Sequence, residues 1–412
     1  MLAYATRRYL AEYRAATDNE IATDLLFLEH AEKTPETIGY IPRVPLWLGR
    51  FSNNAALTRL VSQLVGLCWR ILAGLPFHLF KAIQLLRHRL RLAPIQSQTL
   101  LDVNEVGLAL SRRATEVVKW PEIPAPEVWI VPPWVDVDSD ERRNVSLLYL
   151  VSVRDIALAF QLALLATWTM GRDAQRRRWI LQTYTAVPWF LARIALTRVD
   201  ADFVMAEHFD RWAVMADMVT RAWRREGRRE RKLTLVQHGY IGNMKGQKIR
   251  SLPPYKLAAV TALYVYDDAS DAMFRSDFLA SSAAKTATGH RFKPRISLTP
   301  LAGDETFSIL FVGHPLCADL QLAVLEQLRC IPVSVFYKPH PLAGLPASCK
   351  DKFWIIIEDR TLFPVVNIVV TYHSTLITEY EHHGIMSIVH GLTNKTDECS
   401  QVVTKILSSL PR

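Results

Sequence analysis

The feature that most constrains the fold is a series of short apolar runs in the second half of the chain, each followed at once by polar residues. In IVVTYHST, at residues 368–375, three β-branched apolar residues precede Thr371, Tyr372 and His373. A strand buried on both faces of a parallel sheet reads as such a run, because helices cover both sides of it. The runs therefore predict parallel α/β units with polar groups beyond the strand ends.

We expect nine strands, several of them spaced widely enough for a helical crossover. They are residues 128–131, 203–205, 233–236, 263–266, 308–312, 333–337, 354–357, 368–371 and 387–389. The start of the chain is mainly helical in its periodicity. We expect a helical region over residues 1–120, an acceptor-side α/β domain over residues 121–290 and a donor-binding α/β domain over residues 291–412, with a polar linker over residues 281–304.

The formal net charge is +9, from 49 basic and 40 acidic residues, which favours an anionic partner. No nucleic-acid-binding motif accompanies this charge, so nucleic acid is not an expected partner. The five cysteines are scattered and lack the paired spacing of zinc or redox sites. Together with an N-terminus that lacks the apolar core of a secretory signal, they predict a cytoplasmic protein without a structural metal.

Residues 57–92 are the first of two apolar segments that we weighed as membrane spans. No uncharged run in them reaches the eighteen or so residues of a span. Arg59, Arg70 and Lys81 recur every eleven residues, which places them on one side of a continuous helix. That side could lie on the anionic inner face of the cytoplasmic membrane, or the helix could pack on its own domain. The second segment, residues 145–170, predicts a buried core helix.

Polar residues follow four predicted strands, in VQHG (236–239), VGHP (312–315), KPHP (338–341) and HST (373–375). In open α/β sheets, ligands bind beyond the carboxyl ends of the strands. The candidate ligand-binding residues are Gly313, His314, Lys338, His340, Ser374, Thr375 and Glu379. Ser374 and Thr375 could bind an anion at a helix start, cap that helix, or do both.

The motifs KPHP and VVTYHST, with VQHG before them, resemble those of the GT-B glycosyltransferases of bacterial surface polysaccharide synthesis. The resemblance covers residues 200–395. It is strongest to families with a His-Pro and a Ser-Ser or Ser-Thr motif: sialyltransferases, polysialyltransferases and the Kdo transferases of capsule assembly. The teichoic-acid glycerophosphotransferases are more distant. This resemblance implies two Rossmann-like domains that face a cleft.

On the donor side, the resemblance implies that His340 contacts the phosphate of a CMP-activated sugar. Ser374 and Thr375 would contact the same phosphate, and Glu379 the ribose. Lys338 would add positive charge, and His314 with Gly313 would line the crevice. The resemblance also implies transfer without a metal or another cofactor, since the nucleotide-sugar is a co-substrate.

On the acceptor side, a general base must deprotonate a hydroxyl group, and imidazole titrates in the right range. His238 matches a strand-end histidine of the glycerophosphotransferases, and a role in holding its loop is nearly as well supported. Glu207 and Asp210, which follow another predicted strand, are the next candidates.

These inferences predict an inverting glycosyltransferase that acts on a glycan or lipid-linked acceptor with a donor of the CMP-sialic acid or CMP-Kdo type. A CDP-glycerol glycerophosphotransferase and a UDP-sugar transferase keep the fold and change the donor. A membrane-associated assembly subunit without catalysis is the alternative from another class.

Overall fold

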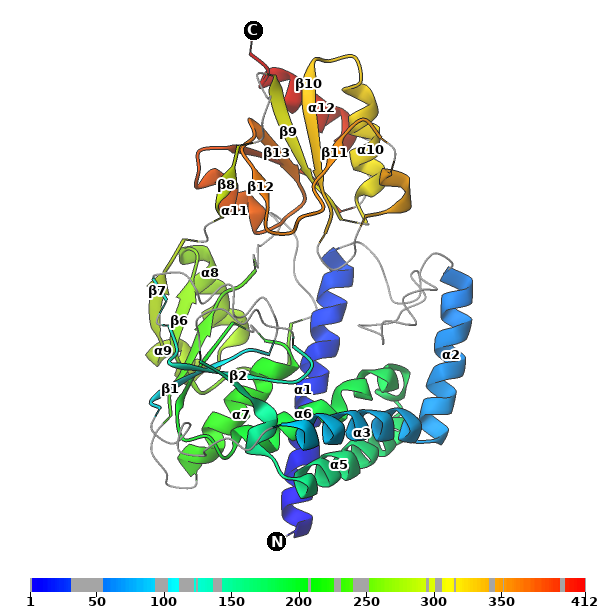
Figure 1. The fold of residues 1–412 in the computed structure, drawn as a ribbon, viewed down its shortest axis with the longest axis vertical. Coiled ribbons are helices and arrows are strands. Elements are labelled where there is room, and N and C mark those ends of the chain that lie inside the picture. Colours follow the sequence, from blue (N-terminus) through cyan, green and yellow to red (C-terminus); the bar gives the residue numbers. More distant parts are fainter. Residues whose placement is uncertain are drawn as a thin grey trace. The chain divides into compact units, whose positions relative to one another are not determined.

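In the computed structural model, the residues described are 2–30, 55–92, 103–110, 122–123, 125–135, 143–206, 209–225, 231–239, 252–293, 296–300, 306–314, 316–340, 345–350, 352–392 and 397–411. They form two compact units (Figure 1). Unit 1 holds the described residues up to Phe292, apart from His30 and Gly239, which group with unit 2. Unit 2 holds those from Lys293 onward.

Unit 1 contains a seven-stranded sheet in which all neighbouring strands are parallel. Its order is β3 (Arg143–Ser146), β2 (Val128–Val131), β1 (Glu105–Leu108), β4 (Asp202–Met205), β5 (Leu233–Val236), β6 (Val260–Val265) and β7 (Thr288–Arg291). The chain adds strands outward from β1 to β3, then returns to place β4 on the other side of β1. The predicted α/β class with a parallel, Rossmann-like sheet is therefore confirmed.

The helical elements of unit 1 include long helices before the sheet and in its crossovers. They are α1 (Leu2–His30), α2 (Ala55–Ile71), α3 (Leu75–Arg91), η3 (Leu147–Leu150), α5 (Val153–Arg172), η4 (Arg177–Thr185), α6 (Ala186–Leu196), α7 (Arg211–Arg225), α8 (Asp268–Met273), η5 (Phe274–Phe278) and α9 (Ser281–Thr286). Buried ion pairs tie α1 to this unit. Arg193 Nε lies 2.8 Å from a carboxylate oxygen of the partly buried Glu12, and Arg211 pairs with Glu20 in an almost fully enclosed contact.

Unit 2 contains a five-stranded parallel sheet, in the order β11 (Ile355–Ile356), β10 (Val333–Lys338), β9 (Phe307–Val312), β13 (Ile368–Thr371) and β14 (Met386–Val389). A small pair, β8 (Leu298–Thr299) and β12 (Phe363–Pro364), lies beside it. The remaining elements are α10 (Ala318–Gln327), η6 (Ala347–Cys349), α11 (Leu376–Glu381) and α12 (Glu398–Ser408).

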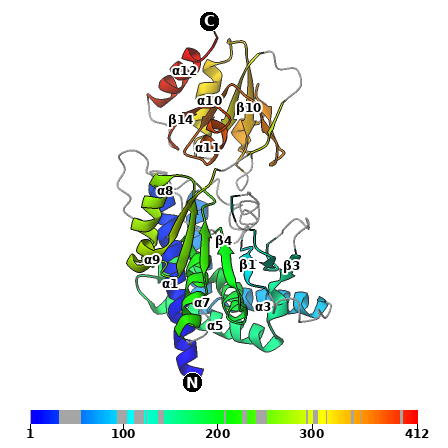
Figure 2. The same ribbon diagram turned by 90° about the vertical axis from the view of Figure 1, so that its left-hand side faces the viewer.

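Two apolar clusters show how the central strands of unit 2 are buried. One face of the sheet packs against α10 and α12, as Figure 2 shows, with Ile309 and Val335 among its contributors. The other face contributes Leu310 and Phe336 and packs against α11 and the β8–β12 pair. Alternate residues of one strand thus enter opposite clusters, which explains the continuous apolar runs in the sequence.

Three sequence expectations need correction. The segment predicted as a helical region, residues 1–120, includes β1, which lies between β2 and β4 in the unit 1 sheet, and the compact unit does not end at residue 120. Half of the residues in the linker predicted over residues 281–304 lie in regular elements, because α9 and β7 complete unit 1 and β8 belongs to unit 2. The segment 145–170 begins with the end of β3 and η3, and α5 starts only at Val153.

The helix expected over residues 57–92 is two helices. Ala73 and Gly74 have positive φ angles of 49° and 66°, and the helices on either side of this break differ in direction by 78°. A β-carbon at Gly74 would lie 2.8 Å from Trp69 Nε1, so glycine is needed there. The eleven-residue spacing of the basic residues therefore does not define one helix face.

Candidate functional site

The candidate site lies at the carboxyl edge of the unit 2 sheet. Strand order reverses there between β9 and β13: β10 and β11 extend the sheet on one side of β9, and β13 and β14 on the other. The connections after β9 and β13 therefore leave the sheet in opposite directions, which opens a crevice at their carboxyl ends. The residues that follow β9 and β13 are therefore the first candidates for contact with a ligand.

Three side chains meet at this reversal. His314 follows β9, His340 follows β10 and Tyr372 follows β13. The ring centroid of His314 lies 5.1 Å from that of His340 and 5.2 Å from that of Tyr372, both in edge-to-face geometry. We call His314, His340 and Tyr372 the aromatic triad. The structure thus brings together two histidines that the sequence had placed twenty-six residues apart.

The side chains of the triad are in protonation states that carry hydrogen-bond donors. The Leu316 N–H donates to His314 Nδ1 over 3.1 Å, so a neutral His314 ring carries its proton on Nε2. Burial lowers the pKa of His340, which keeps that imidazole neutral near pH 7. Burial raises the pKa of Tyr372, which keeps its hydroxyl protonated. The triad therefore contains N–H and O–H groups, the kind of donor that anionic ligands accept from, and the Tyr372 side chain also hydrogen-bonds that of Ser374.

His373 and His390 extend the row of strand-end histidines, because they follow β13 and β14. Burial lowers the pKa of both rings. His390 is already bonded on both sides: Nδ1 lies 2.6 Å from the Gly391 carbonyl oxygen, and Nε2 lies 3.1 Å from the Gln321 amide nitrogen. His390 therefore joins β14 to α10, whereas His373, although its ring is partly desolvated, is a solvent-exposed residue.

Lys338 and Gly313 have structural partners in this unit. Lys338 Nζ donates to the carbonyl oxygens of Asp359, at 2.9 Å, and Leu362, at 2.8 Å. Burial lowers the pKa of this amine to about 8, an effect that the Asp359 carboxylate opposes. At Gly313, a β-carbon would lie 2.2 Å from Tyr337 Oη. Gly313, which we expected to line the crevice, is thus needed for the close approach of the Tyr337 phenol.

Ser374 and Thr375 differ in how their hydroxyl groups are used. The Leu376 N–H donates to Ser374 Oγ over 3.3 Å, so Ser374 holds the turn into α11. Thr375 is the N-cap residue, and its side chain makes no capping hydrogen bond. Because α11 has only six residues, its dipole is a weaker source of positive potential than we expected. Glu379, predicted to meet a ribose, is only 2% exposed and lies inside unit 2.

The predicted base candidates belong to unit 1. His238 follows β5, and its neighbour Gln237 is buried, accepting a hydrogen bond from the Tyr266 N–H at 3.0 Å. Asp210 caps α7, since its carboxylate accepts from the N–H groups of Trp212, at 2.9 Å, and Ala213, at 3.0 Å. This helix-capping role makes Asp210 a weaker base candidate. Glu207 lies outside the described residues.

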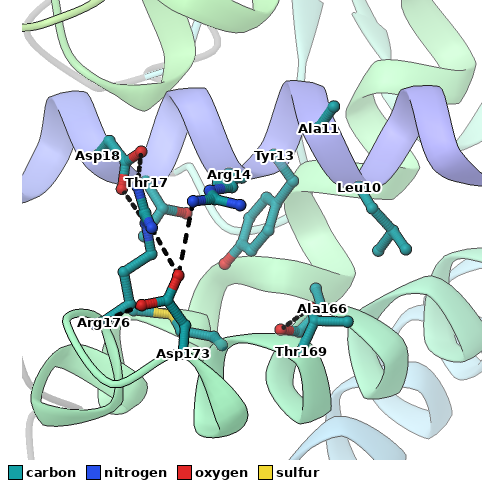
Figure 3. Close-up of a pocket in the computed structure, with 11 residues that line it drawn as sticks. Leu10, Ala11, Tyr13, Arg14, Thr17, Asp18, Ala166, Thr169, Asp173 and Arg176 are labelled. Carbon is teal, nitrogen blue, oxygen red and sulfur yellow. Dashed lines mark hydrogen bonds and ion pairs between the residues drawn. The ribbon is translucent and has the colours of Figure 1, made fainter.

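A cavity of about 270 Å³ lies elsewhere in unit 1, between α1, α5 and the start of η4 (Figure 3). Its lining consists of Leu10, Ala11, Tyr13, Arg14, Thr17, Asp18, Ala166, Thr169, Met170, Asp173 and Arg176. Arg176 forms ion pairs with Asp18 at 2.8 Å and with Asp173 at 2.6 Å, so the positive and negative charges that line the cavity largely neutralise one another. None of the predicted site residues lines this cavity.

Within the described parts of the chain, no group of three or more His, Cys, Asp or Glu side chains is arranged to hold a metal ion. Comparison of the sequence with protein-family models gave no matching family, and comparison with curated proteins gave no match.

Sequence reasoning did not select Tyr372 as a site residue. The available signal was its position, the first residue after the β13 run IVVT, where any side chain borders the crevice. Hydroxyl and imidazole groups drew attention to its neighbours instead. The triad carries the types of donor group that bind an anion such as a phosphate.

Proposed function

We propose that the chain is an inverting glycosyltransferase and that unit 2 binds a nucleotide-activated sugar beyond β9, β10 and β13. The observation that carries this proposal is the aromatic triad at the strand-order reversal of unit 2. Doubly wound parallel sheets bind nucleotides at such reversals. The GT-B arrangement of the two units and the absence of a metal requirement are parts of the proposal that come from the resemblance of the motifs.

Unit 2 would supply the leaving-group side of the reaction. As the bond between the anomeric carbon and the phosphate oxygen breaks, negative charge grows on the nucleotide phosphate. Donors placed in advance around that charge lower the barrier, since they need not reorient during the reaction. His340, the Tyr372 hydroxyl and the Thr375 hydroxyl are the groups that we assign to this task.

Unit 1 would supply the base. The acceptor hydroxyl forms the new bond to the anomeric carbon and gives its proton to His238. Imidazole suits this step because its ordinary pKa lies near neutrality. Since Asp210 already caps α7, we prefer His238 to Asp210 in this role.

We propose a CMP-linked acidic sugar of the sialic acid or Kdo type as the donor, and a glycan or a lipid-linked molecule as the acceptor. The first test is a thermal titration of the whole chain with CMP, CDP, UDP and GDP, because a ligand that binds only the folded state raises the melting temperature. We expect CMP to stabilise the protein most. A preference for CDP or UDP would assign a different donor, and no shift with any nucleotide would refute the proposed site.

Matched variants locate the binding. His340→Ala, Tyr372→Phe and Thr375→Val should each weaken the CMP-dependent shift. His383→Ala is the control, since His383 is an exposed histidine of the same unit whose ring contacts the Ile296 carbonyl oxygen. Equal losses in the control and the site variants would contradict the assignment.

A further variant separates binding from chemistry. His238→Ala should retain the nucleotide-dependent shift and lose transfer to the acceptor, so kcat falls while donor binding persists. Transfer that survives in this variant would exclude His238 as the base. Measurement with and without EDTA tests the expected independence of metal.

A further inference from the structure

Three helices of unit 1 carry an unusual number of exposed apolar side chains. Of the 21 large apolar residues that are exposed in the described parts of the chain, fifteen lie in residues 57–90 or on α5. A concentration of exposed apolar side chains on a protein surface marks a site that binds another protein or a membrane. We call these fifteen side chains the exposed apolar surface.

The spacing of these residues is that of helix stripes. On α2, Leu60, Leu64, Leu67 and Ile71 recur at intervals of four, three and four residues. On α3, Leu75, Leu79, Ile83 and Leu90 fall on one side in the same way. Ile71 and Leu90 are each 70% exposed. Each helix thus directs one apolar stripe away from the protein.

The opposite sides of α2 and α3 are anchored in unit 1. From α2, Trp69 Nε1 donates to Thr183 Oγ1 over 2.8 Å. From α3, the fully buried His78 bonds Thr167 Oγ1 of α5 over 2.9 Å, and Figure 1 shows α3 lying along α5. The two helices therefore satisfy their packing through these inner sides, and the outward stripes are additional apolar surface.

The charge along α2, α3 and the residues between them is of one sign. Residues 55–92 contain six basic residues and no acidic residue. Arg87 and Arg91 are exposed beside the α3 stripe. At the end of α5, the guanidinium of Arg172 lies 3.6 Å from the ring centroid of the exposed Trp168. Basic side chains and a tryptophan bordering apolar stripes are typical of helices at the surface of an anionic bilayer.

The geometry favours helices that lie on a membrane over helices that cross it. Among the described residues, α5 is long and apolar enough to cross a membrane, and so is the bent α2–α3 pair if it is counted as one span. Each of α2 and α3 has 17 residues, about 26 Å of helix, short of the ~30 Å hydrocarbon core. The 78° bend and the anchored inner sides also oppose a crossing.

A second copy of the chain is a poorer occupant of the exposed apolar surface. In a two-fold contact through the same surface, the basic residues of one copy would face those of the other. Residues 55–92 offer no carboxylate to pair with them, and Asp155 on α5 is already bonded to Arg198 at 2.7 Å. A bilayer with anionic headgroups complements both the apolar stripes and the charge.

We propose that the outward sides of α2, α3 and α5 dock unit 1 on a lipid bilayer that carries anionic headgroups. The apolar stripes enter the boundary between headgroups and acyl chains, while Arg87, Arg91 and Arg172 contact phosphate groups. This assignment needs no nucleotide, so it stands or falls independently of the proposed glycosyl transfer.

The test is flotation of the full chain with vesicles of phosphatidylcholine alone or of an equimolar mixture with phosphatidylglycerol. We expect binding to the mixed vesicles that weakens as salt is raised, because exposed charges are screened. Failure of the unaltered chain to float with the anionic vesicles would overturn the proposal.

Two paired variants test which residues bind. Ile71→Ser with Leu90→Ser should reduce partitioning into mixed vesicles by about tenfold or more, given the apolar area lost from each site. Arg87→Gln with Arg91→Gln should reduce binding to mixed vesicles and remove its salt dependence in part. Leu407→Ser and Arg329→Gln are matched controls on exposed positions of unit 2, and should float like the unaltered chain.

Thermal melting of each variant checks that it is folded. If the serine variant does not fold, the arginine variant and the salt dependence of the unaltered chain still decide the matter. Equal flotation of controls and docking variants would overturn the proposal. So would a concentration-dependent dimer in light scattering that the serine variant abolishes, since a second copy would then cover the exposed apolar surface.

Discussion

Replacing His78 by glutamine should remove a specific acid sensitivity from unit 1. His78 is fully buried between α3 and α5, where its Nε2 bonds Thr167 Oγ1 at 2.9 Å. Burial lowers the pKa of this imidazole from 6.5 to about 4. As the pH falls below 6.5, the unfolded chain therefore binds a proton that the folded chain does not, and the free energy of unfolding decreases until the pH reaches about 4.

The size of this effect follows from the pKa shift. Each pH unit in that window lowers the free energy of unfolding by about 1.4 kcal/mol, or roughly 3 kcal/mol over the whole window. Glutamine keeps a hydrogen-bonding group for Thr167 and does not titrate. The variant should therefore lose stability at neutral pH, through poorer packing beside Trp69, and should lose less of its remaining stability in acid.

The assay is denaturant unfolding from about pH 7 to about pH 4, followed by tryptophan fluorescence. Ten of the eleven tryptophans precede Phe292, so the signal reports mainly on unit 1. His88→Gln, an exposed histidine on the same helix, is the control and should follow the unaltered chain. If His78→Gln retains the full acid sensitivity of the unaltered chain, the reasoning from burial is wrong.

The remaining predictions concern glycines and a helix cap. Gly313→Ala should destabilise unit 2 by about 1–3 kcal/mol, because a β-carbon would collide with the buried Tyr337, whereas Gly66→Ala within α2 meets no atom within 4 Å and should stabilise unit 1 by about 0.5–1 kcal/mol. Denaturation midpoints that move in the same direction for both would contradict this. Ser152→Ala removes the capping box with Asp155 and should cost about 1 kcal/mol, and Thr404→Ala on the exposed side of α12 is its control. Equal effects of these two substitutions on unfolding would show that the capping box does not contribute.

Three strands that the apolar runs did not predict, β1, β3 and β7, share one property. The residues of β7, TGHR, are all exposed, and this edge strand is held by its backbone pairing with β6. The strand β3, RNVS, is also at an edge, and β1, EVGL, is short and contains a glycine. None has the long apolar run that marks a strand buried on both faces. Hydrogen bonding to a neighbour decided these strands, and that neighbour is remote in the sequence.

The sequence did not reveal the break between α2 and α3 at Ala73 and Gly74, for a related reason. Apolar periodicity continues across it, so the segment 57–92 reads as a single amphipathic helix. The positive φ angles there allow Trp69 and His78 to anchor the two helices at different places in unit 1. The sequence indicated the surface character of this segment, and the structure showed that apolar residues, rather than the basic ones alone, face outward.

By itself the sequence determined the parallel α/β class and the bounds of its most apolar strands, because burial on both faces requires continuous apolar runs. It also identified His314 and His340 as strand-end residues. Only the tertiary structure decided what each polar group contacts: Lys338 binds two carbonyl oxygens, Glu379 is enclosed, and Tyr372 joins the two histidines. The physical reason is that strand order fixes which ends are neighbours, and that order depends on pairing between residues far apart in the chain.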